Sequence, residues 1–577
     1  MEQKIGNCCF KSGLVEPGLC QTEFKPDLFK FANNITNRLQ AVPKLLNCYT
    51  GCVKKNGVIA LVRTALLSAG VLCLFVIKKD YRMKLSKLYK VVLASSMMVA
   101  SAAVFAAQPN AKVYSSSINI EGLYNADVQK NIDSQISKLT SKKYTLVLKD
   151  LTEEEIKAAV DKYPEVTGVT VDSDKIRSIA ALAGMKNLES VYINSKYVSD
   201  YTPLADKVTL TSLRIDSEDI DNLKWMTKLE RLSTVDITGS IKLQDLTGLP
   251  KLPALRKISL NHIQPSDLSV LAAQVPGVSQ VDLRYAVVKD LAPLCALGML
   301  NNVDLYGATV TDYGQLENCS KLTKVTTYAS KTADFSALKK IKSLEEINGG
   351  LTDLSDVSWV TELPNLKKFD VFAEKVHDFA PIAKSTIEDF KVWSMKDDID
   401  LSSLANAKNI KKFTIWGGQK KIDNVEKALE TMENLEKLEL TSMDKGTPNL
   451  DGSFAKNLKK LSEVRIEKLV TFKTEGMENL SALSKISIGK VTNPVNVAFM
   501  EKLEKLESVE LHDVTVENSQ ALANNPHIKY VNLKNIKGFD LEALKKNANL
   551  QRVTLSSKDF TKEQIQGFAS TVKVSYN

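Results

Sequence analysis

The sequence predicts an α/β solenoid, a horseshoe of short repeated units with a parallel β-sheet on its concave side. A phrase of the form LxxLxL returns along residues 166–555, for example as LESVYI, LTSLRI and LNNVDL. Its step is 21 to 26 residues and most often 22. A second column, of Asp, returns at a 22-residue step from Asp290 to Asp400. A period of this length indicates units that pack only on their neighbours, because one unit cannot bury its apolar face alone.

Each LxxLxL phrase predicts one short parallel strand, and the residues after it predict a return path on the convex side. The first positions of the phrases are Val166, Leu188, Leu210, Leu232, Leu255, Val278, Leu300, Leu322, Leu344, Leu366, Ile387, Ile410, Leu435, Leu461, Leu483, Leu506, Ile528 and Leu550. This core at this spacing is the leucine-rich-repeat signature, and we expect roughly 18–20 units.

The Asp column predicts how the convex side is built. Its members are Asp290, Asp312, Asp334, Asp356, Asp378 and Asp400, each followed directly by an apolar or aromatic residue. An Asp at the start of a helical or 3₁₀ turn can accept hydrogen bonds from the free N–H groups of that turn. We therefore expect 3₁₀ or short α-helices there, and a structural role for these carboxylates.

Both ends of a solenoid need caps, because the core would otherwise be open to water. We expect an amino-terminal cap at residues 107–165, with helices near 125–139 and 151–163 around a strand at 144–149. The run TEEE places acidic residues at a helix start, where negative charge is favourable. A carboxyl-terminal cap is expected at residues 556–577, with a helix over 561–569 and a strand over 571–577.

Residues 1–106 differ from the rest of the chain in charge and in cysteine content. They hold 15 Lys and Arg against 5 Asp and Glu, whereas the remaining residues hold 62 against 63. The near-neutral body gives no support to a nucleic-acid partner. Cys8, Cys9, Cys48 and Cys52 lack His partners and a second CxxC, so no metal site is predicted.

Residues 83–106 have the layout of a signal peptide, with basic MKLSKLYK before apolar VVLASSMMVASAAVFA. Because this segment starts after 82 residues, we interpret Met83 as the start of translation and residues 1–82 as a leader of doubtful authenticity. Residues 57–77 of that leader are long and apolar enough to resemble a membrane span, although Arg63 interrupts them. A real membrane anchor stays as the alternative, and membrane contact is expected only in that case.

The longer repeat phrase, for example LNNVDLYGATVTDYGQLENCSKL, resembles the 22-residue repeats of internalin-type bacterial surface proteins. The resemblance covers about residues 166–555 and implies a curved solenoid whose concave face holds a host or surface protein. Two departures limit it. No LPxTG sorting signal follows the array, so covalent wall attachment is not expected. The Asn usual three residues after the last strand position is replaced, so no asparagine ladder is expected; the replaced sites are Lys196, Glu218, Ala286, Ala308, Ser330, Glu374, Met443, Val514 and Ile536.

A stripe of aromatic residues is the strongest candidate binding site. The residues just after consecutive strand phrases are Tyr306, Tyr328, Gly350, Phe372, Trp393 and Trp416. Neighbouring strands lie roughly 4.8 Å apart, so five aromatics in six rungs would form a stripe of about 25 Å on the concave face. Exposed Tyr and Trp are typical of binding hot spots. The alternative is that the rings stack on one another and stiffen the sheet.

Lysines flank the stripe on the same face. The candidate polar residues are Lys324, Lys368, Lys391 and Lys412, interleaved with acidic residues such as Glu346 and Asp389. Aromatic and mixed-charge columns suit a protein surface, where the charges set orientation more than affinity.

Cys295 and Cys319 lie in adjacent units and leave two interpretations open. In an exported protein they could pair as a disulfide if their Cα atoms lie close enough. Cys319 also occupies the column of Leu297 and Ile341, which favours a buried thiol equally well.

The sequence contains no catalytic motif. Its four histidines lie in distant repeats, and HExxH, GxSxG and Walker-loop sequences do not occur. We therefore expect no enzyme, no catalytic residues, no cofactor and no metal. The expected function is that of an exported, monomeric, adhesin-like protein that binds a partner protein on its concave face. The alternatives are an envelope scaffold held by residues 57–77 and a carbohydrate-binding solenoid.

Overall fold

The computed structural model describes the backbone of residues 47–55, 58–67 and 70–76, and residues 111–576 outside the short gaps at 241, 244–245, 266, 330–333, 350–353, 373–374, 394–397, 419–420 and 443–448. The chain divides into two compact units, Met1–Gln108 and Pro109–Asn577. The predicted signal peptide, residues 83–106, lies outside the described residues.

The described part of the first unit is a three-stranded antiparallel sheet. Its strands are β1 (Asn47–Lys55), β2 (Val58–Leu67) and β3 (Gly70–Val76), with β2 in the middle. The described residues of the apolar segment 57–77 belong to β2 and β3. In the part of the chain that the structure describes, no helix is long and apolar enough to cross a membrane.

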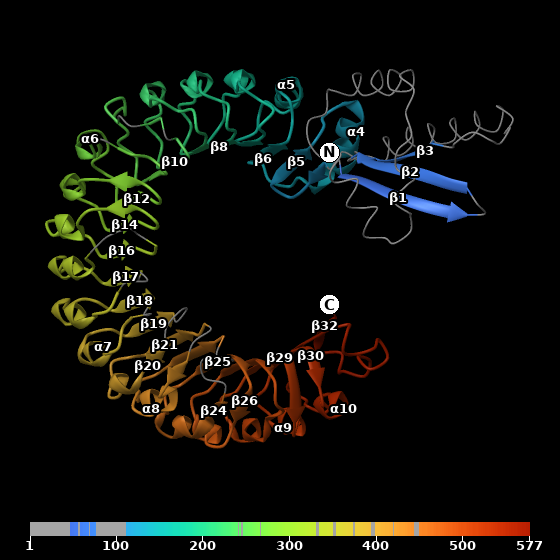
Figure 1. Cartoon of the computed structure of the whole chain (residues 1–577), viewed down its shortest axis with the longest axis vertical. Helices are drawn as coiled ribbons and strands as arrows, with labels where there is room; N and C mark the ends of the chain where they lie inside the picture. Colours follow the sequence, from blue (N-terminus) through green and yellow to red (C-terminus); the bar gives the residue numbers. More distant parts are fainter. Residues whose placement is uncertain are drawn as a thin grey trace, which may run out of the picture. The chain divides into compact units, whose positions relative to one another are not determined.

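The second unit is built on one long sheet, which is parallel except where β4 meets β5. Equivalent residues of successive phrases pair in register, as Val303 does with Val325 and Val325 with Ile347. Alternation of side chains buries one face of each strand, so that Val191 and Ile193 of β8 are buried and the intervening residue is not. Figure 1 shows the sheet on the inner side of an arc formed by this unit.

The described strands of this sheet are β4 (Lys112–Val113), β5 (Ser117–Glu121), β6 (Thr145–Lys149), β7 (Gly168–Asp172), β8 (Ser190–Asn194), β9 (Ser212–Asp216), β10 (Thr234–Thr238), β11 (Lys257–Asn261), β12 (Gln280–Asp282), β14 (Asn302–Asp304), β16 (Lys324–Thr326), β17 (Glu346–Asn348), β18 (Lys368–Phe372), β19 (Asp389–Trp393), β21 (Lys412–Trp416), β23 (Lys437–Thr441), β25 (Glu463–Leu469), β27 (Lys485–Val491), β29 (Ser508–Glu517), β30 (Tyr530–Lys537), β31 (Arg552–Leu555) and β32 (Lys573–Tyr576). Short parallel pairs form beside it: β13 (Val287–Val288) with β15 (Thr309–Val310), β20 (Ile399–Asp400) with β22 (Ile422–Asp423), β24 (Asn449–Asp451) with β26 (Thr471–Lys473), and β28 (Val495–Asn496) with the end of β29.

Short helices occupy the outer side of the arc (Figure 1). The described α-helices are α4 (Ala126–Gln135), α5 (Glu153–Lys162), α6 (Ser269–Gln274), α7 (Ala380–Lys384), α8 (Val425–Leu429), α9 (Gln520–Asn524) and α10 (Leu541–Leu544). The 3₁₀-helices are η1 (Ile136–Lys138), η2 (Ala180–Gly184), η3 (Thr202–Leu204), η4 (Lys224–Met226), η5 (Ala292–Ala296), η6 (Tyr313–Leu316), η7 (Ser336–Lys340), η8 (Ser358–Glu362), η9 (Ser402–Leu404), η10 (Gly452–Asn457), η11 (Met477–Asn479) and η12 (Ala498–Lys502).

The Asp column starts the convex turns, as the sequence predicts. From Asp290 to Asp400, each of the six carboxylates accepts a hydrogen bond from the backbone N–H two residues later, at 2.7–2.9 Å. These bonds satisfy N–H groups that have no partner within the turn itself.

The amino-terminal end of the array carries α4 and α5 around β6. Thr152 begins α5 with a capping box, in which its hydroxyl accepts from the Glu155 N–H and the Glu155 carboxylate accepts from the Thr152 N–H. Ile156 and Val160 of α5 are buried in the common core.

The predicted helix over residues 561–569 is wrong, because the structure places only turns there. The reciprocal hydrogen bonds of a helix start are present between Thr561 and Gln564. Gly567 then adopts φ +92, a left-handed conformation that ends a helix. The predicted strand is present as β32.

The expectation about the asparagine ladder concerns only the column three residues after the last strand position, which carries no Asn at the replaced sites. Amides in two other columns bridge some neighbouring units instead. Each donates to a backbone carbonyl of the preceding unit at 2.7–3.0 Å; these residues are Asn365, Asn409, Asn434, Asn525 and Asn547. The bridges satisfy carbonyl groups in the return path between neighbouring units.

Cys295 and Cys319 form a disulfide between adjacent convex turns, with their Cα atoms 4.3 Å apart. Of the two interpretations that the sequence left open, the structure therefore adopts the paired one.

Candidate functional site

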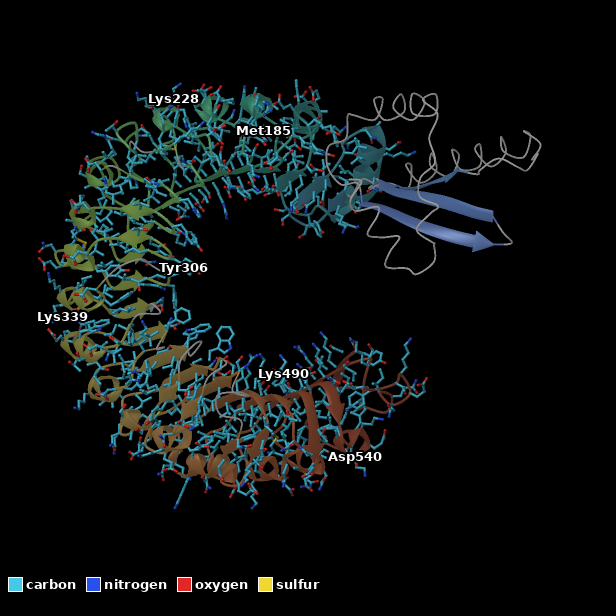
Figure 2. The ribbon with its side chains drawn as sticks, viewed as in Figure 1. Met185, Lys228, Tyr306, Lys339, Lys490 and Asp540 are labelled. Atoms are coloured by element: carbon cyan, nitrogen blue, oxygen red, sulfur yellow. A yellow bond between two sulfur atoms is a disulfide. The ribbon has the colours of Figure 1, made fainter. Side chains whose placement is uncertain are left out.

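The predicted aromatic residues project from the carboxyl ends of consecutive strands onto the concave side. Phe372, Trp393 and Trp416 are partners in register on β18, β19 and β21. Tyr306 and Tyr328 follow β14 and β16 in the same column. Figure 2 shows Tyr306 at the inner edge of the arc. Gly350, the sixth predicted position, lies outside the described residues.

Neighbouring rings of this column contact one another. The centroid distances are 6.4 Å from Tyr306 to Tyr328, 5.4 Å from Tyr328 to Phe372, 5.7 Å from Phe372 to Trp393 and 4.1 Å from Trp393 to Trp416. The Tyr328–Phe372 contact spans the rung of β17, so the chain of rings is continuous. Aromatic pairs at such distances and tilts are mutually attractive.

Two further rings, which the sequence analysis missed, extend the column toward the amino terminus. Tyr285 lies 5.4 Å from Tyr306, and His262 stacks on Tyr285 at 4.6 Å. Both sit one position later in the repeat, at φ +58 and +60. The left-handed backbone turns their side chains toward the column. We call the seven residues the aromatic ladder: His262, Tyr285, Tyr306, Tyr328, Phe372, Trp393 and Trp416.

A glycine makes room for this extension. Gly307 follows Tyr306 at φ +65, and a Cβ built there would lie 2.5 Å from the Tyr285 ring. Glycine adopts such a φ without strain. Gly239 and Gly307 stand in the same column as His262 and Tyr285, and they are the sequence signal for a left-handed turn after each strand.

The ladder is exposed near both ends and half-buried in its middle. Tyr285 is 48% exposed, Tyr306 37% and Trp416 42%, whereas Tyr328, Phe372 and Trp393 are half-buried. The rings therefore brace one another, as the stiffening interpretation expects, and they also present apolar surface to a ligand.

The buried carboxylate of Asp370 fixes the middle of the ladder. It accepts a hydrogen bond from the Trp393 indole N–H at 2.5 Å and lies 3.7 Å from the Lys391 ammonium. Lys391 Nζ also lies 4.1 Å from the centroid of the Trp393 ring, a cation–π contact. Burial, followed by Asp370, raises the pKa of Tyr328 above its ordinary value of 10, so its phenol stays protonated.

Charged side chains run parallel to the ladder along the other end of the strands. Glu346 accepts from Lys324 at 3.0 Å and from Lys368 at 2.9 Å. Burial opposes ionisation of Glu346, but hydrogen bonds from Lys368, Asn348 and Lys324 outweigh it and lower its pKa below 4.5. Glu346 and the two lysines help to line a hollow of about 420 Å³. Lys412 is the strand partner of Asp389. Burial raises the pKa of Asp389 above 3.8, although Lys412 and Lys368 act to lower it.

A second charged cluster lies farther along the concave face. His512 on β29 crosses over β27 and reaches Glu467 on β25, with Nε2 3.2 Å from Oε1. Its Nδ1 lies 3.1 Å from Asp513 Oδ2. Gly489 on β27 allows this crossing, because a Cβ there would collide with the imidazole ring. The two ring nitrogens face different carboxylates and do not converge with them on one point.

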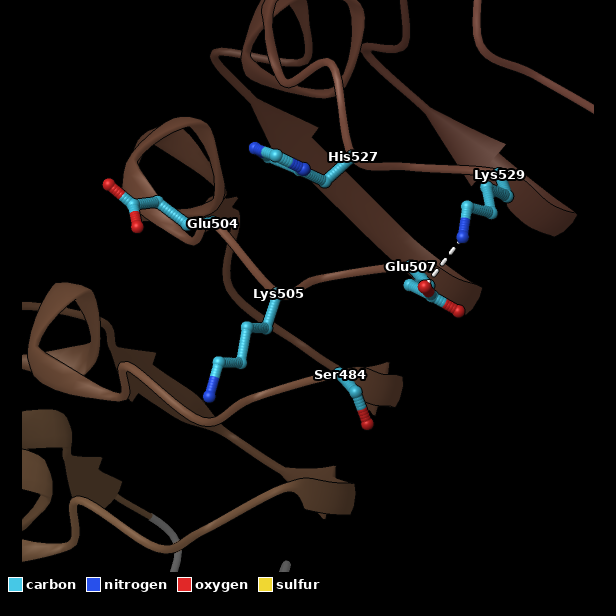
Figure 3. A pocket seen from close by; sticks show the side chains of 6 residues that line it. All are labelled: Ser484, Glu504, Lys505, Glu507, His527 and Lys529. Atoms are coloured by element: carbon cyan, nitrogen blue, oxygen red, sulfur yellow. Dashed lines mark hydrogen bonds and ion pairs between the residues drawn. The ribbon is translucent and has the colours of Figure 1, made fainter.

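Another hollow, of about 450 Å³, lies near the amino-terminal ends of strands β27, β29 and β30. Figure 3 shows its lining of Ser484, Glu504, Lys505, Glu507, His527 and Lys529. Glu507 and Lys529 pair at 2.6 Å. Across the residues that the structure describes, no three His, Cys, Asp or Glu side chains are placed to hold a metal ion.

The register of the sheet identifies the fold. Equivalent positions of consecutive phrases pair residue for residue over β7 to β31, with short helices on the convex return. The chain is a leucine-rich-repeat solenoid. The fold that the sequence predicts is therefore confirmed.

Comparisons with known proteins find similar solved structures but no matching sequence family. No protein-family model matches the chain, and neither does any curated protein. The chain is similar to the internalin inlF of Listeria monocytogenes, with 19% identity over 53% of this chain and 87% of that chain and a TM-score of 0.41. It is also similar to a leucine-rich-repeat protein of Leptospira interrogans, with 14% identity over 75% and 93% and a TM-score of 0.37. The Drosophila Toll–Spatzle complex gives 10% identity over 88% and 65% and a TM-score of 0.43. The similar structures thus include an internalin, as the resemblance in sequence predicts, and the similarity concerns the fold alone.

Proposed function

We propose that this chain is an exported, monomeric protein-binding solenoid of the adhesin type, without catalytic activity, which holds a partner protein on its concave face at the aromatic ladder. The observation that carries the proposal is the ladder itself, with exposed rings at its ends and rigidly held rings between them. Rigid aromatic side chains lose little conformational entropy when they are covered, which is why hot spots favour them.

Two observations support export. Residues 83–106 have the sequence layout of a signal peptide. The Cys295–Cys319 disulfide fits an oxidising compartment, because cytosolic thiols are kept reduced. Amino-terminal sequencing of the natural protein tests this step: a chain that begins near Ala107 supports it, and a chain that keeps residues 57–77 supports the envelope scaffold instead.

Removal of the two indoles tests the binding site. We expect the double substitution Trp393→Ala with Trp416→Ala to weaken capture of the partner at least about 30-fold, since two hot-spot residues contribute more than about 2 kcal/mol. Capture is measured with immobilised protein and surface extracts of the cells or tissue that the organism contacts, followed by titration of the captured protein. Tyr530→Ala is the matched control, because Tyr530 is 40% exposed and lies on β30, outside the ladder. Unchanged capture by the double variant would remove the ladder from the proposal.

A further inference from the structure

The spacing of the aromatic ladder restricts what kind of ligand can follow it. The ladder runs across the strands from β11 to β21, so its rings repeat with the strand spacing of about 4.8 Å. A ligand that contacts many rings must therefore lie along the arc, at right angles to the strands. Over the seven strand spacings involved, this is a track of about 34 Å.

A polyproline II helix matches this repeat. It has three residues per turn and rises about 3.1 Å per residue, so one turn advances about 9.3 Å. Two strand spacings advance about 9.6 Å. Every third residue of such a segment would meet every second rung, and about 11 residues would cover the whole track.

The shape of the ladder also suits proline rings. Successive aromatic planes are tilted by 69° between Tyr285 and Tyr306, 74° between Tyr328 and Phe372, and 54° between Trp393 and Trp416, whereas His262 and Tyr285 are nearly parallel at 15°. Tilted neighbours form ridges and troughs into which proline rings can fit. Lys391 already covers one face of Trp393, which removes that face as a flat platform.

The pairing of charged side chains on the concave face favours an uncharged ligand. At the other end of the same strands, signs alternate from Lys324 to Glu346 to Lys368, and these groups pair with one another. Lys391 is likewise matched by Asp370. A surface that compensates its own charges attracts neither a polyanion nor a polycation, and aromatic-lined tracks are the surfaces that bind proline-rich segments.

We propose that the aromatic ladder binds a proline-rich segment of the partner protein in the polyproline II conformation, lying along the arc across β11 to β21. This inference rests on the proposed function, because it names the chemistry of the partner at the same site. A polyproline helix has no internal hydrogen bonds to break and is already extended, so little ordering opposes its binding.

The experiment measures fluorescence anisotropy of a labelled 15-residue polyproline peptide with the purified full-length protein. A labelled 15-residue Gly-Ser peptide is the matched control. We expect saturable binding of the polyproline peptide, at least tenfold weaker binding of the Gly-Ser peptide, and quenching or a shift of the tryptophan fluorescence. Saturation with a linear β-glucan oligosaccharide but not with polyproline would overturn the inference in favour of a glycan.

Variants locate the binding. Trp393→Ala with Trp416→Ala should weaken polyproline binding at least tenfold, while Tyr530→Ala leaves it unchanged. Tyr285→Ala with Tyr306→Ala gives a second test on exposed rings, with folding checked by circular dichroism. Equal binding by both double variants and the unmodified protein would overturn the inference.

The two levels of the proposal fail in different ways. If the indole variant loses the natural partner but the unmodified protein never binds polyproline, the ligand class is wrong and the binding site stands. If the indole variant keeps the natural partner, the proposed site itself is wrong.

Discussion

Gly489 shows how the absence of one side chain allows three polar ones to meet. His512 lies over it and reaches Glu467 two strands away, where Arg465 also donates at 3.0 Å. Burial acts to raise the pKa of Glu467, but Arg465 and His512 outweigh it and hold the pKa below 4.5. A cluster of this kind is stable only while every member keeps its partner.

We expect Gly489→Ala to lower the free energy of unfolding by about 1–3 kcal/mol, because the new Cβ displaces the imidazole and leaves Glu467 with fewer partners. Urea denaturation followed by circular dichroism measures the change. Gly298→Ala is the control, since a Cβ at Gly298 meets nothing within 4 Å. Equal midpoints for the two variants would show that His512 moves aside without cost.

The sequence predicted five rings of the aromatic ladder and missed two. A strand phrase identifies which residue follows the strand, and alternation then places Tyr306 or Trp416 on the concave face. It does not identify residues such as Tyr285, whose direction depends on a left-handed φ rather than on alternation. Nor could spacing alone decide whether Cys295 and Cys319 pair.

Each convex turn of the Asp column depends on the Asp that precedes it. η6 begins after Asp312, whose carboxylate accepts from the Gly314 N–H at 2.7 Å. The turn has only four residues, so few other bonds hold its amino-terminal end. The Asp column was predictable from sequence because each turn needs the same acceptor at the same place.

We expect Asp312→Ala to destabilise the protein by about 1 kcal/mol, the usual loss for a removed cap. Asp312→Asn should recover most of this loss, because an Asn side chain accepts the same hydrogen bond. Thermal unfolding of the three proteins side by side measures both effects. A full loss in the Asn variant would mean that charge rather than capping is responsible.

Elements at the end of the array were harder to predict than those inside it. Inside, each strand is specified by its own residues and by two neighbouring units that repeat the same pattern. At residues 561–569 this support is reduced, and a helix-like start ends in a left-handed glycine at position 567. The amide bridges between units were missed for a related reason, since their Asn residues occupy columns other than the one considered in the sequence.

The solenoid of residues 109–577 is held by contacts between neighbouring repeats, and charge contributes to these contacts on the concave face. Glu346 and Glu463 each bridge lysines of the two adjacent strands. Burial opposes their ionisation, but the lysines outweigh it and lower both pKa values below 4.5. Burial instead raises the pKa of Asp304 and Asp389 above 3.8, and their ionised forms therefore oppose folding.

These shifts predict a loss of stability in acid. A carboxylate with a lowered folded pKa contributes stability above pH 4.5, and that contribution is lost as the pH falls through the folded value. We expect the thermal midpoint to fall steadily below about pH 4.5, with the raised Asp304 and Asp389 offsetting only part of the loss. Glu346→Gln should flatten this dependence. A midpoint that rises on acidification would mean that the two aspartates outweigh the bridging glutamates.

The disulfide between adjacent turns has a mechanical consequence. If the solenoid is pulled from its two ends, its repeats should unfold one at a time, because each repeat contacts only its neighbours. Each repeat of 22 residues then releases about 7–8 nm of chain. The Cys295–Cys319 disulfide shields the segment between its cysteines, which are 24 positions apart, from the applied force. Optical-tweezer traces should therefore show a total extension about 8 nm shorter in the oxidised protein, restored by a reducing agent. If this protein tethers a cell, the disulfide reduces the maximum length of the tether. Tension then cannot fully unfold the two repeats that the disulfide joins.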